Sequence, residues 1–167
     1  MRRVLTLALL AAFAPLPLAA DPPQVEHQPS PCTVPGKAIS LCATITDDGE
    51  VRRARIYFRP AGDKFYSVVE MAFDGIKYCG TLPAPRERKG KSIEYYVQAI
   101  DDQLDTQRTS TFQLGVQPES LCEFPPVETN AGRAAAITVY ATDRKQGNKL
   151  PEAFQSTGVT FVPVPGK

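Results

Sequence analysis

The chain has 167 residues, enough for one domain with a hydrophobic core. Its formal net charge of +1 excludes a global electrostatic attraction to nucleic acid or to an anionic membrane. With 16 Pro, one His and no Trp, the composition favours strands joined by loops over helices.

The first 20 residues have the order of a secretory signal peptide. Residues 1–3 are basic at Arg2 and Arg3, residues 4–13 are apolar, and prolines then precede a small-residue cleavage point at Ala20. The apolar run is too short to span a bilayer, and no later stretch is long enough. We therefore expect residues 1–20 to be removed, leaving an exported protein, periplasmic or extracellular, without a transmembrane span in the mature chain.

Residues 21–36 are proline-rich and show no periodic pattern, so we expect an extended N-terminal tail. The one histidine, His27, lies in this tail without nearby partners for metal binding or catalysis. Export also makes disulfides the expected state of the four cysteines, for which three pairings exist. These cysteines are Cys32, Cys42, Cys79 and Cys122.

Alternating apolar residues predict six strands, the clearest being residues 92–101, where Tyr95, Val97 and Ala99 share one face. The other five are expected at residues 38–46, 52–59, 65–73, 76–82 and 109–116. Asp74-Gly75 predicts a two-residue hairpin turn in which Phe73 opposes Ile76 on the core-facing side. Short strands separated by turn signals indicate a β-sandwich.

Two stretches carry a resemblance to known modules. Tyr95-x-Val97-x-Ala99 followed by Asp101 resembles the penultimate strand of fibronectin type III and immunoglobulin-like modules, and residues 43–59 resemble the opening of similar modules in secreted bacterial proteins. The resemblance covers residues 38–116 and implies an all-β, immunoglobulin-like (fibronectin type III-like) β-sandwich at residues 37–118. It also implies that the Tyr95 hydroxyl makes a corner hydrogen bond to the backbone.

The same resemblance implies a disulfide pairing. It places the first and fourth predicted strands side by side, so that Cys42 and Cys79 bridge them on the outer face. It brings both ends of the sandwich to one pole, where Cys32 and Cys122 close the module. A local Cys32–Cys42 bridge is the alternative.

The C-terminal part is harder to place. We expect a linker at residues 119–133 and a short β-rich appendage at residues 134–167, with strands at residues 136–142 and 158–163. About 45 residues rarely form a core alone. The appendage therefore docks on the sandwich, pairs with a partner's edge strand, or stays loosely ordered.

Carboxylates and an Arg–Tyr stripe are the candidate sites. Resemblance places two acidic loops at one pole, where hard oxygen ligands suit calcium, although the spacing matches no defined calcium loop and the carboxylates also suit turn capping. The candidate calcium ligands are Asp47, Asp48, Asp101 and Asp102. The candidate binding face has Arg53, Arg55, Tyr57 and Arg59 on one strand and Tyr96 on another. Arg and Tyr are enriched at binding hot spots, whereas the alternative is a solvated face with arginines paired to Glu70 or Glu94.

Motifs for catalysis are missing from the sequence. It contains no GxSxG, no HExxH and no glycine-rich phosphate loop, and its cysteines are too widely spaced for a CxxC motif. We therefore expect a non-catalytic exported binding or structural module with an unknown protein or cell-envelope partner, no nucleic-acid partner, and no cofactor apart from calcium. One alternative is an accessory subunit of an envelope assembly whose C-terminal strands pair with a partner. Another is a carboxylate-based hydrolase.

Overall fold

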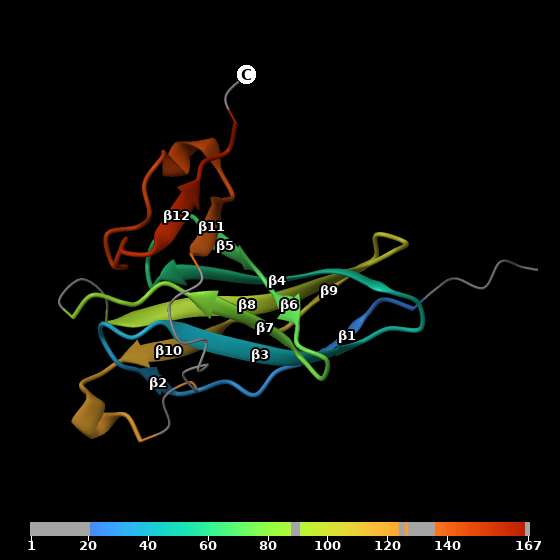
Figure 1. The fold of residues 1–167 in the computed structure, drawn as a ribbon, viewed down its shortest axis with the longest axis horizontal. Coiled ribbons are helices and arrows are strands. Elements are labelled where there is room, and N and C mark those ends of the chain that lie inside the picture. The colour runs from blue at the N-terminus through green and yellow to red at the C-terminus, as the bar shows by residue number, and fades with distance from the viewer. Residues whose placement is uncertain (1–20, 88–90, 124–125, 127–135, 166–167) are drawn as a thin grey trace, which may run out of the picture.

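A computed structural model of the chain describes residues 21–87, 91–123, 126 and 136–165 (Figure 1). The predicted signal peptide, residues 1–20, lies outside the described residues. Within them the chain is all-β and forms two sheets, with only two short 3-10 turns, η1 (Glu119–Leu121) and η2 (Arg144–Gln146). No helix in this part of the chain is long and apolar enough to cross a membrane.

The smaller sheet has four antiparallel strands. Their order is β1 (Gln24–Glu26), β3 (Ile39–Thr46), β7 (Tyr78–Leu82) and β6 (Ala72–Phe73). The larger sheet has eight strands, and β9 (Thr106–Arg108) pairs with one of its members outside the main order. That order is β12 (Val159–Val162), β11 (Ile137–Ala141), β5 (Ser67–Glu70), β4 (Val51–Pro60), β8 (Ser92–Asp101), β10 (Phe112–Val116) and β2 (Cys32–Thr33).

The core lies between the two sheets and follows from strict alternation along the strands. Along β8 every second residue is buried, and Tyr95, Val97 and Ala99 are fully inaccessible to solvent, as the sequence pattern predicted. Strands β3 and β4 contribute the facing side chains. The buried residues of these two strands that belong to the hydrophobic core are Ile39, Leu41, Ala43 and Ile45, and Ala54, Ile56 and Phe58.

Residues 21–36 are part of the sandwich and not the extended tail expected from their composition. Strand β1 pairs with β3 in the smaller sheet, and β2 pairs in parallel with β10 in the larger sheet. The N-terminal segment therefore passes from one sheet to the other. Strands of three and two residues are too short to show a periodic pattern in the sequence, which is why this segment was misread.

The predicted hairpin also differs from the structure. Residues 65–73 form two strands and not one. Strand β5 pairs with β4 in the larger sheet, and the chain then crosses to the smaller sheet, where β6 pairs with β7. Phe73 opposes Tyr78 and not Ile76. The exposed fractions of the Phe73 and Ile76 side chains are 58% and 80%, so the core-facing assignment of both was wrong. Asp74 Oδ1 accepts hydrogen bonds from the backbone N–H groups of Ile76 and Lys77, which sets a turn at Gly75-Ile76.

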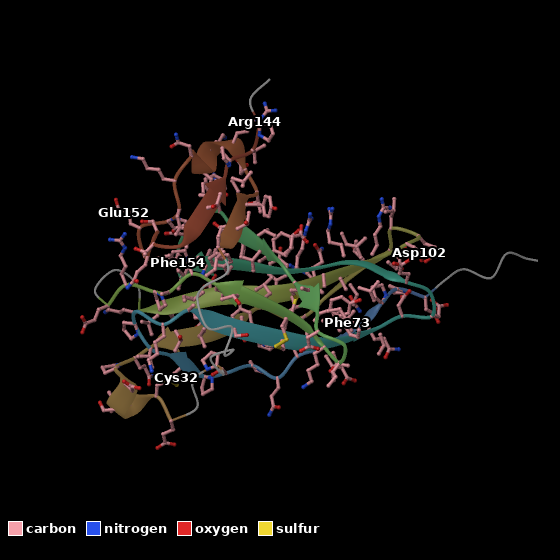
Figure 2. All side chains as sticks on the ribbon, in the orientation of Figure 1. Cys32, Phe73, Asp102, Arg144, Glu152 and Phe154 are labelled. Carbon is pink, nitrogen blue, oxygen red and sulfur yellow. A yellow bond between two sulfur atoms is a disulfide. The ribbon has the colours of Figure 1, made fainter. Side chains whose placement is uncertain are left out.

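The C-terminal segment docks on the sandwich, the first of the three arrangements left open by the sequence (Figure 1). Strand β11 pairs antiparallel with β5, and β12 pairs in parallel with β11, so both extend the larger sheet. Between them Phe154 (labelled in Figure 2), which is 1% exposed, packs edge to face on Phe58 with ring centroids 5.1 Å apart. The segment therefore shares the core of the sandwich.

Candidate functional site

The two disulfides have the pairing that the resemblance implied. Cys32–Cys122 and Cys42–Cys79 are formed, and no free cysteine remains among the described residues. Two disulfides are typical of an oxidising, exported compartment. Cys32 and Cys122 are 4% and 6% exposed and pack with Val34. Cys42 and Cys79 are half-buried on the outer face of the smaller sheet, directly opposite each other on β3 and β7.

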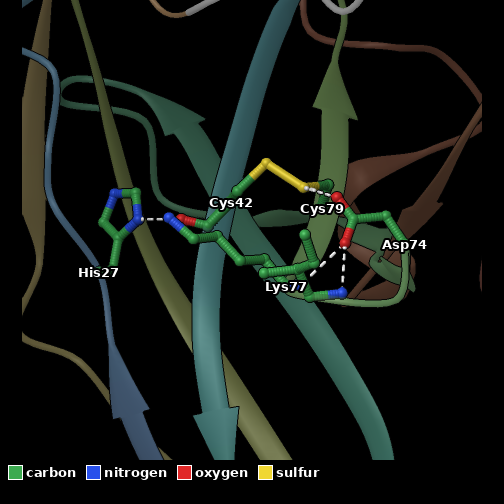
Figure 3. Close-up of a disulfide and its surroundings, with 6 residues drawn as sticks. His27, Cys42, Asp74, Lys77 and Cys79 are labelled. Carbon is green, nitrogen blue, oxygen red and sulfur yellow. Dashed lines mark hydrogen bonds between the residues drawn. A yellow bond between two sulfur atoms is a disulfide. The ribbon is translucent and has the colours of Figure 1, made fainter.

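A groove of about 1000 Å³ runs beside the Cys42–Cys79 disulfide. One wall is the N-terminal segment at residues 26–31, the other side is formed by β3, Asp74, Lys77 and Cys79, and Pro126 also lines the groove. Figure 3 shows the disulfide bridging the two strands, with His27 on one side and Asp74 on the other. Asp74 Oδ2 lies 3.7 Å from Cys79 Sγ, a contact with no shared proton because the sulfur is in a disulfide. Backbone hydrogen bonds from Lys77 and Ile76 lower the pKa of Asp74, which keeps this carboxyl group charged.

His27 fastens the N-terminal segment to the sandwich. Its Nδ1 lies 2.8 Å from the carbonyl oxygen of Cys42, and its Nε2 lies 2.8 Å from the Tyr95 hydroxyl. Since a carbonyl oxygen only accepts, Nδ1 carries the proton, and Nε2 of the neutral ring accepts from Tyr95. The Tyr95 hydroxyl also takes a backbone hydrogen bond from Ser30, although burial dominates and raises the pKa of Tyr95. The Tyr95 hydroxyl therefore has a backbone hydrogen bond, as the resemblance implied, and its partners His27 and Ser30 lie in the N-terminal segment.

The neutral state of His27 predicts a pH dependence of stability. Desolvation lowers the pKa of His27 below its ordinary value of 6.5, although the hydrogen bond to Cys42 opposes the shift. Below about pH 6.5 the unfolded chain therefore binds more protons at His27 than the folded chain does. The stability contributed by neutral His27 is fully present above that pH. It is lost as the pH falls through the pKa of His27 in the folded protein. We expect the free energy of unfolding, measured by urea titration, to decrease as the pH is lowered from 7.5 to 5.5.

The variant His27→Gln should flatten this pH dependence, because His27 is the only histidine in the chain. An equal slope in the variant and in the wild type would show that other groups carry the effect. Sequence reasoning missed this role because the partners of His27 are 15 and 68 residues away along the chain.

The predicted Arg–Tyr stripe forms one connected surface on the outer face of the larger sheet. Tyr57 and Tyr96 are opposite each other on β4 and β8, and their rings stack with centroids 4.7 Å apart and an interplanar angle of 6°. Tyr66 meets Tyr96 edge to face at 5.2 Å. The guanidinium of Arg59 lies 4.3 Å from the Tyr66 ring centroid, and that of Arg108 lies 5.1 Å from the Tyr96 ring centroid. We call these residues, with Arg53, Arg55, Glu70 and Glu94, the Arg–Tyr face.

Ion pairs hold part of this face in place. Arg59 pairs with Glu94 at 2.7 Å and Arg55 with Glu70 at 2.9 Å, while Arg53 lies 3.8 Å from Glu70. Burial, the largest single contribution, lowers the pKa of Arg55. The hydrogen bond that Arg55 donates to Glu70 and the charge of Glu70 act in the opposite direction, and the net effect is a raised pKa. These are the ion pairs that the solvated-face alternative predicts. Ion pairing within the face does not exclude binding of the face to a partner. Arg108 was not among the binding residues predicted from the sequence, because β9 lies beyond a turn and joins the face only through its pairing with β8.

The four candidate calcium ligands meet at one end of the sandwich, where Asp47 and Asp48 follow β3, Asp101 is the last residue of β8, and Asp102 follows it. Asp47 Oδ2 accepts the Gly49 N–H at 2.9 Å, and a Cβ at Gly49 would lie 3.0 Å from Asp102 Oδ1. Asp101 is fully buried, and its Oδ1 accepts the Asp105 N–H at 2.7 Å. Asp48 is exposed.

The turn-capping role proposed for these carboxylates is therefore present at Asp47 and Asp101. The described residues contain no group of three or more His, Cys, Asp or Glu side chains placed to hold a metal ion. The calcium site and the carboxylate-based hydrolase stay predictions from the sequence.

Comparison with known proteins gives no family. No family model and no curated protein matches the chain. Among solved structures, an engineered protein aligns with 59% of this chain and 21% of its own, at 13% identity and a TM-score of 0.45. A variant of the SrpA adhesin from Streptococcus sanguinis aligns with 59% of both chains, at 15% identity and a TM-score of 0.40. The chain thus matches less than two thirds of either structure, and at these TM-scores neither likeness carries an argument about function.

Proposed function

We propose that this protein is a non-catalytic, exported binding module of the immunoglobulin-like type, whose Arg–Tyr face binds a carboxylate-bearing surface of a cell-envelope protein. The strand orders support the fold assignment: the N-terminal segment adds one strand to each sheet, and β8 lies between β4 and β10. The observation that carries the binding role is the stacked Tyr57–Tyr96 pair with its flanking arginines.

The geometry of the rings favours a protein partner over a sugar or a nucleobase. Stacking ligands need a free aromatic face. Here Tyr57 and Tyr96 each cover one ring face of the other, Arg108 lies against the Tyr96 ring, and Arg59 covers one face of the Tyr66 ring, which leaves less aromatic surface for a stacked ligand. What the face offers instead is guanidinium N–H groups and phenol hydroxyls. Guanidinium groups in fixed orientation recognise carboxylates through paired hydrogen bonds.

The charge balance of the face agrees with an acidic partner. Its four arginines outnumber its two glutamates by two: two arginines share Glu70, one pairs with Glu94, and Arg108 lies against the Tyr96 ring. The arginines are Arg53, Arg55, Arg59 and Arg108. The two pairs made by Glu70 are partly exposed, and such ion pairs contribute little to stability, so exchanging them for contacts with a partner costs little.

A pull-down from envelope extract tests this function. The wild-type protein should retain an acidic partner, and Arg59→Glu and Tyr96→Ala should each lose it, because the first reverses a charge of the face and the second removes the central ring. Lys77→Glu reverses an exposed charge in the turn before β7, away from the Arg–Tyr face, and should retain the partner. Moderate salt should elute the complex, since exposed charges are screened. Equal retention by all four proteins would sink the proposal.

A second candidate is pairing with a partner's sheet through the C-terminal strands. Within the described chain β12 ends the larger sheet, so one of its edges has no neighbouring strand there. Unpaired edges accept an added strand from a partner. In the same pull-down, Thr160→Lys places a charge at an exposed position of β12 and should remove a partner held by the edge while sparing one held by the Arg–Tyr face.

A further inference from the structure

The two disulfides differ in what can reach them. Cys32 and Cys122 are almost completely buried and pack with Val34. Cys42 and Cys79 are half-buried and line a groove of about 1000 Å³. Thiol–disulfide exchange requires a thiolate to approach one sulfur, so its rate depends on access. The groove supplies that access to one disulfide while the other stays covered.

We propose that Cys42–Cys79 is a thiol-exchange site, at which a dithiol compound or a dithiol oxidoreductase reduces the disulfide while the sandwich stays folded. The backbone around the bond supports this selectivity. Strands β3 and β7 are paired over five residue positions, and the pairs on both sides of Cys42–Cys79 continue the ladder, with three pairs before it and one after it. Opening the sulfur–sulfur bond leaves this pairing intact, and Cys32–Cys122 still ties β2 to the segment after β10.

The reaction balances with the dithiol as reductant. A thiolate of the dithiol attacks one sulfur of Cys42–Cys79, forms a mixed disulfide and releases the other cysteine as a thiolate, which takes up a proton. The second thiol of the dithiol then attacks the mixed disulfide, expels the second cysteine as a thiol and closes the dithiol into its own disulfide. Two electrons pass to Cys42–Cys79.

Two opposite charges lie at this site. The Asp74 carboxylate is 3.7 Å from Cys79 Sγ, and Lys77 lines the same groove (Figure 3). Asp74 repels an incoming thiolate, whereas Lys77 attracts one. The exchange rate should therefore respond to each charge in opposite directions, which a disulfide opened only by unfolding would not show.

Timed reduction of the oxidised protein with dithiothreitol tests the site. Samples are quenched by alkylation, and the four cysteines are read separately by peptide mass. We expect Cys42 and Cys79 to become alkylated together, at a rate proportional to the dithiothreitol concentration, while Cys32 and Cys122 stay oxidised and the near-UV circular dichroism stays native. If all four cysteines react at the same time, or if the rate does not rise with dithiothreitol, the bond opens only through unfolding and the proposal is wrong.

Two charge variants sharpen the test. Asp74→Asn keeps the side-chain oxygen that caps the turn and should raise the rate at Cys42–Cys79 by about fivefold, the factor expected for unit charges about 4 Å apart in water. Lys77→Gln should lower it. Neither variant should change the reaction of Cys32–Cys122. Rates at Cys42–Cys79 that are identical in wild type and in both variants would contradict exchange within the groove.

Discussion

Phe154→Ala is expected to lower the free energy of unfolding by about 4 kcal/mol, the typical loss when a buried phenylalanine is truncated. Phe154 is 1% exposed and packs edge to face on Phe58, so the cavity would open in the common core of the sandwich and the C-terminal segment. Urea denaturation of the purified variant, followed by circular dichroism, measures the change.

The same truncation at an exposed phenylalanine is the control. Phe73 is 58% exposed on the hairpin between β6 and β7, so Phe73→Ala should cost less than about 1 kcal/mol. If Phe154→Ala were as mild as Phe73→Ala, the C-terminal segment would not share the core.

For the same reason, deletion of residues 136–165 should leave a protein that unfolds at lower urea concentration or aggregates, since the deletion exposes Phe58 and the edge of β5.

Replacing both Cys32 and Cys122 with alanine is expected to lower the free energy of unfolding by about 4 kcal/mol. The bond joins residues separated by 90 positions, so its removal frees a long loop in the unfolded state. The loss should be measured by urea denaturation without reductant, with Cys42→Ala/Cys79→Ala as the comparison. That variant frees a loop of similar entropic weight but disturbs a half-buried site instead of the buried cluster with Val34.

A loss below about 1 kcal/mol for Cys32→Ala/Cys122→Ala would contradict the role of this bond in closing the module. The two double variants also separate stability from reactivity. The buried disulfide closes the longer loop, 90 positions against 37, and packs with Val34, so it is expected to contribute more to stability. The half-buried disulfide is expected to dominate the reaction with dithiols.

Local patterns were enough to predict the central strands. Every second residue of residues 92–101 is apolar, and this alternation places Tyr95, Val97 and Ala99 in the core without knowledge of any neighbour. The same reasoning correctly assigned the two faces of β4, with Phe58 inside and Tyr57 outside. The disulfide pairing followed only when strand neighbours were taken from a resemblance.

The position of the turn between β6 and β7 was predicted wrongly, because two local signals in the sequence favour different turns. Asp74-Gly75 is a strong hairpin signal, but the Asp74 side chain caps the two N–H groups that follow and moves the turn to Gly75-Ile76. The shift changes which residues oppose each other and leaves Phe73 and Ile76 in solvent. A one-position change in a turn is decided by hydrogen bonds that the strand pattern does not contain.

The sequence by itself determined the all-β class, the core faces of the long strands and the Arg–Tyr composition of one outer face, because alternation with a period of two needs only neighbouring residues. Only the tertiary structure decided the rest. The N-terminal segment adds a strand to each of the two sheets, and His27 bonds to Tyr95. Arg108 lies beside Tyr96, and Phe154 packs in the core on Phe58. Each of these joins residues distant in the chain, and short or irregular segments gain their stability from such contacts and not from local propensity.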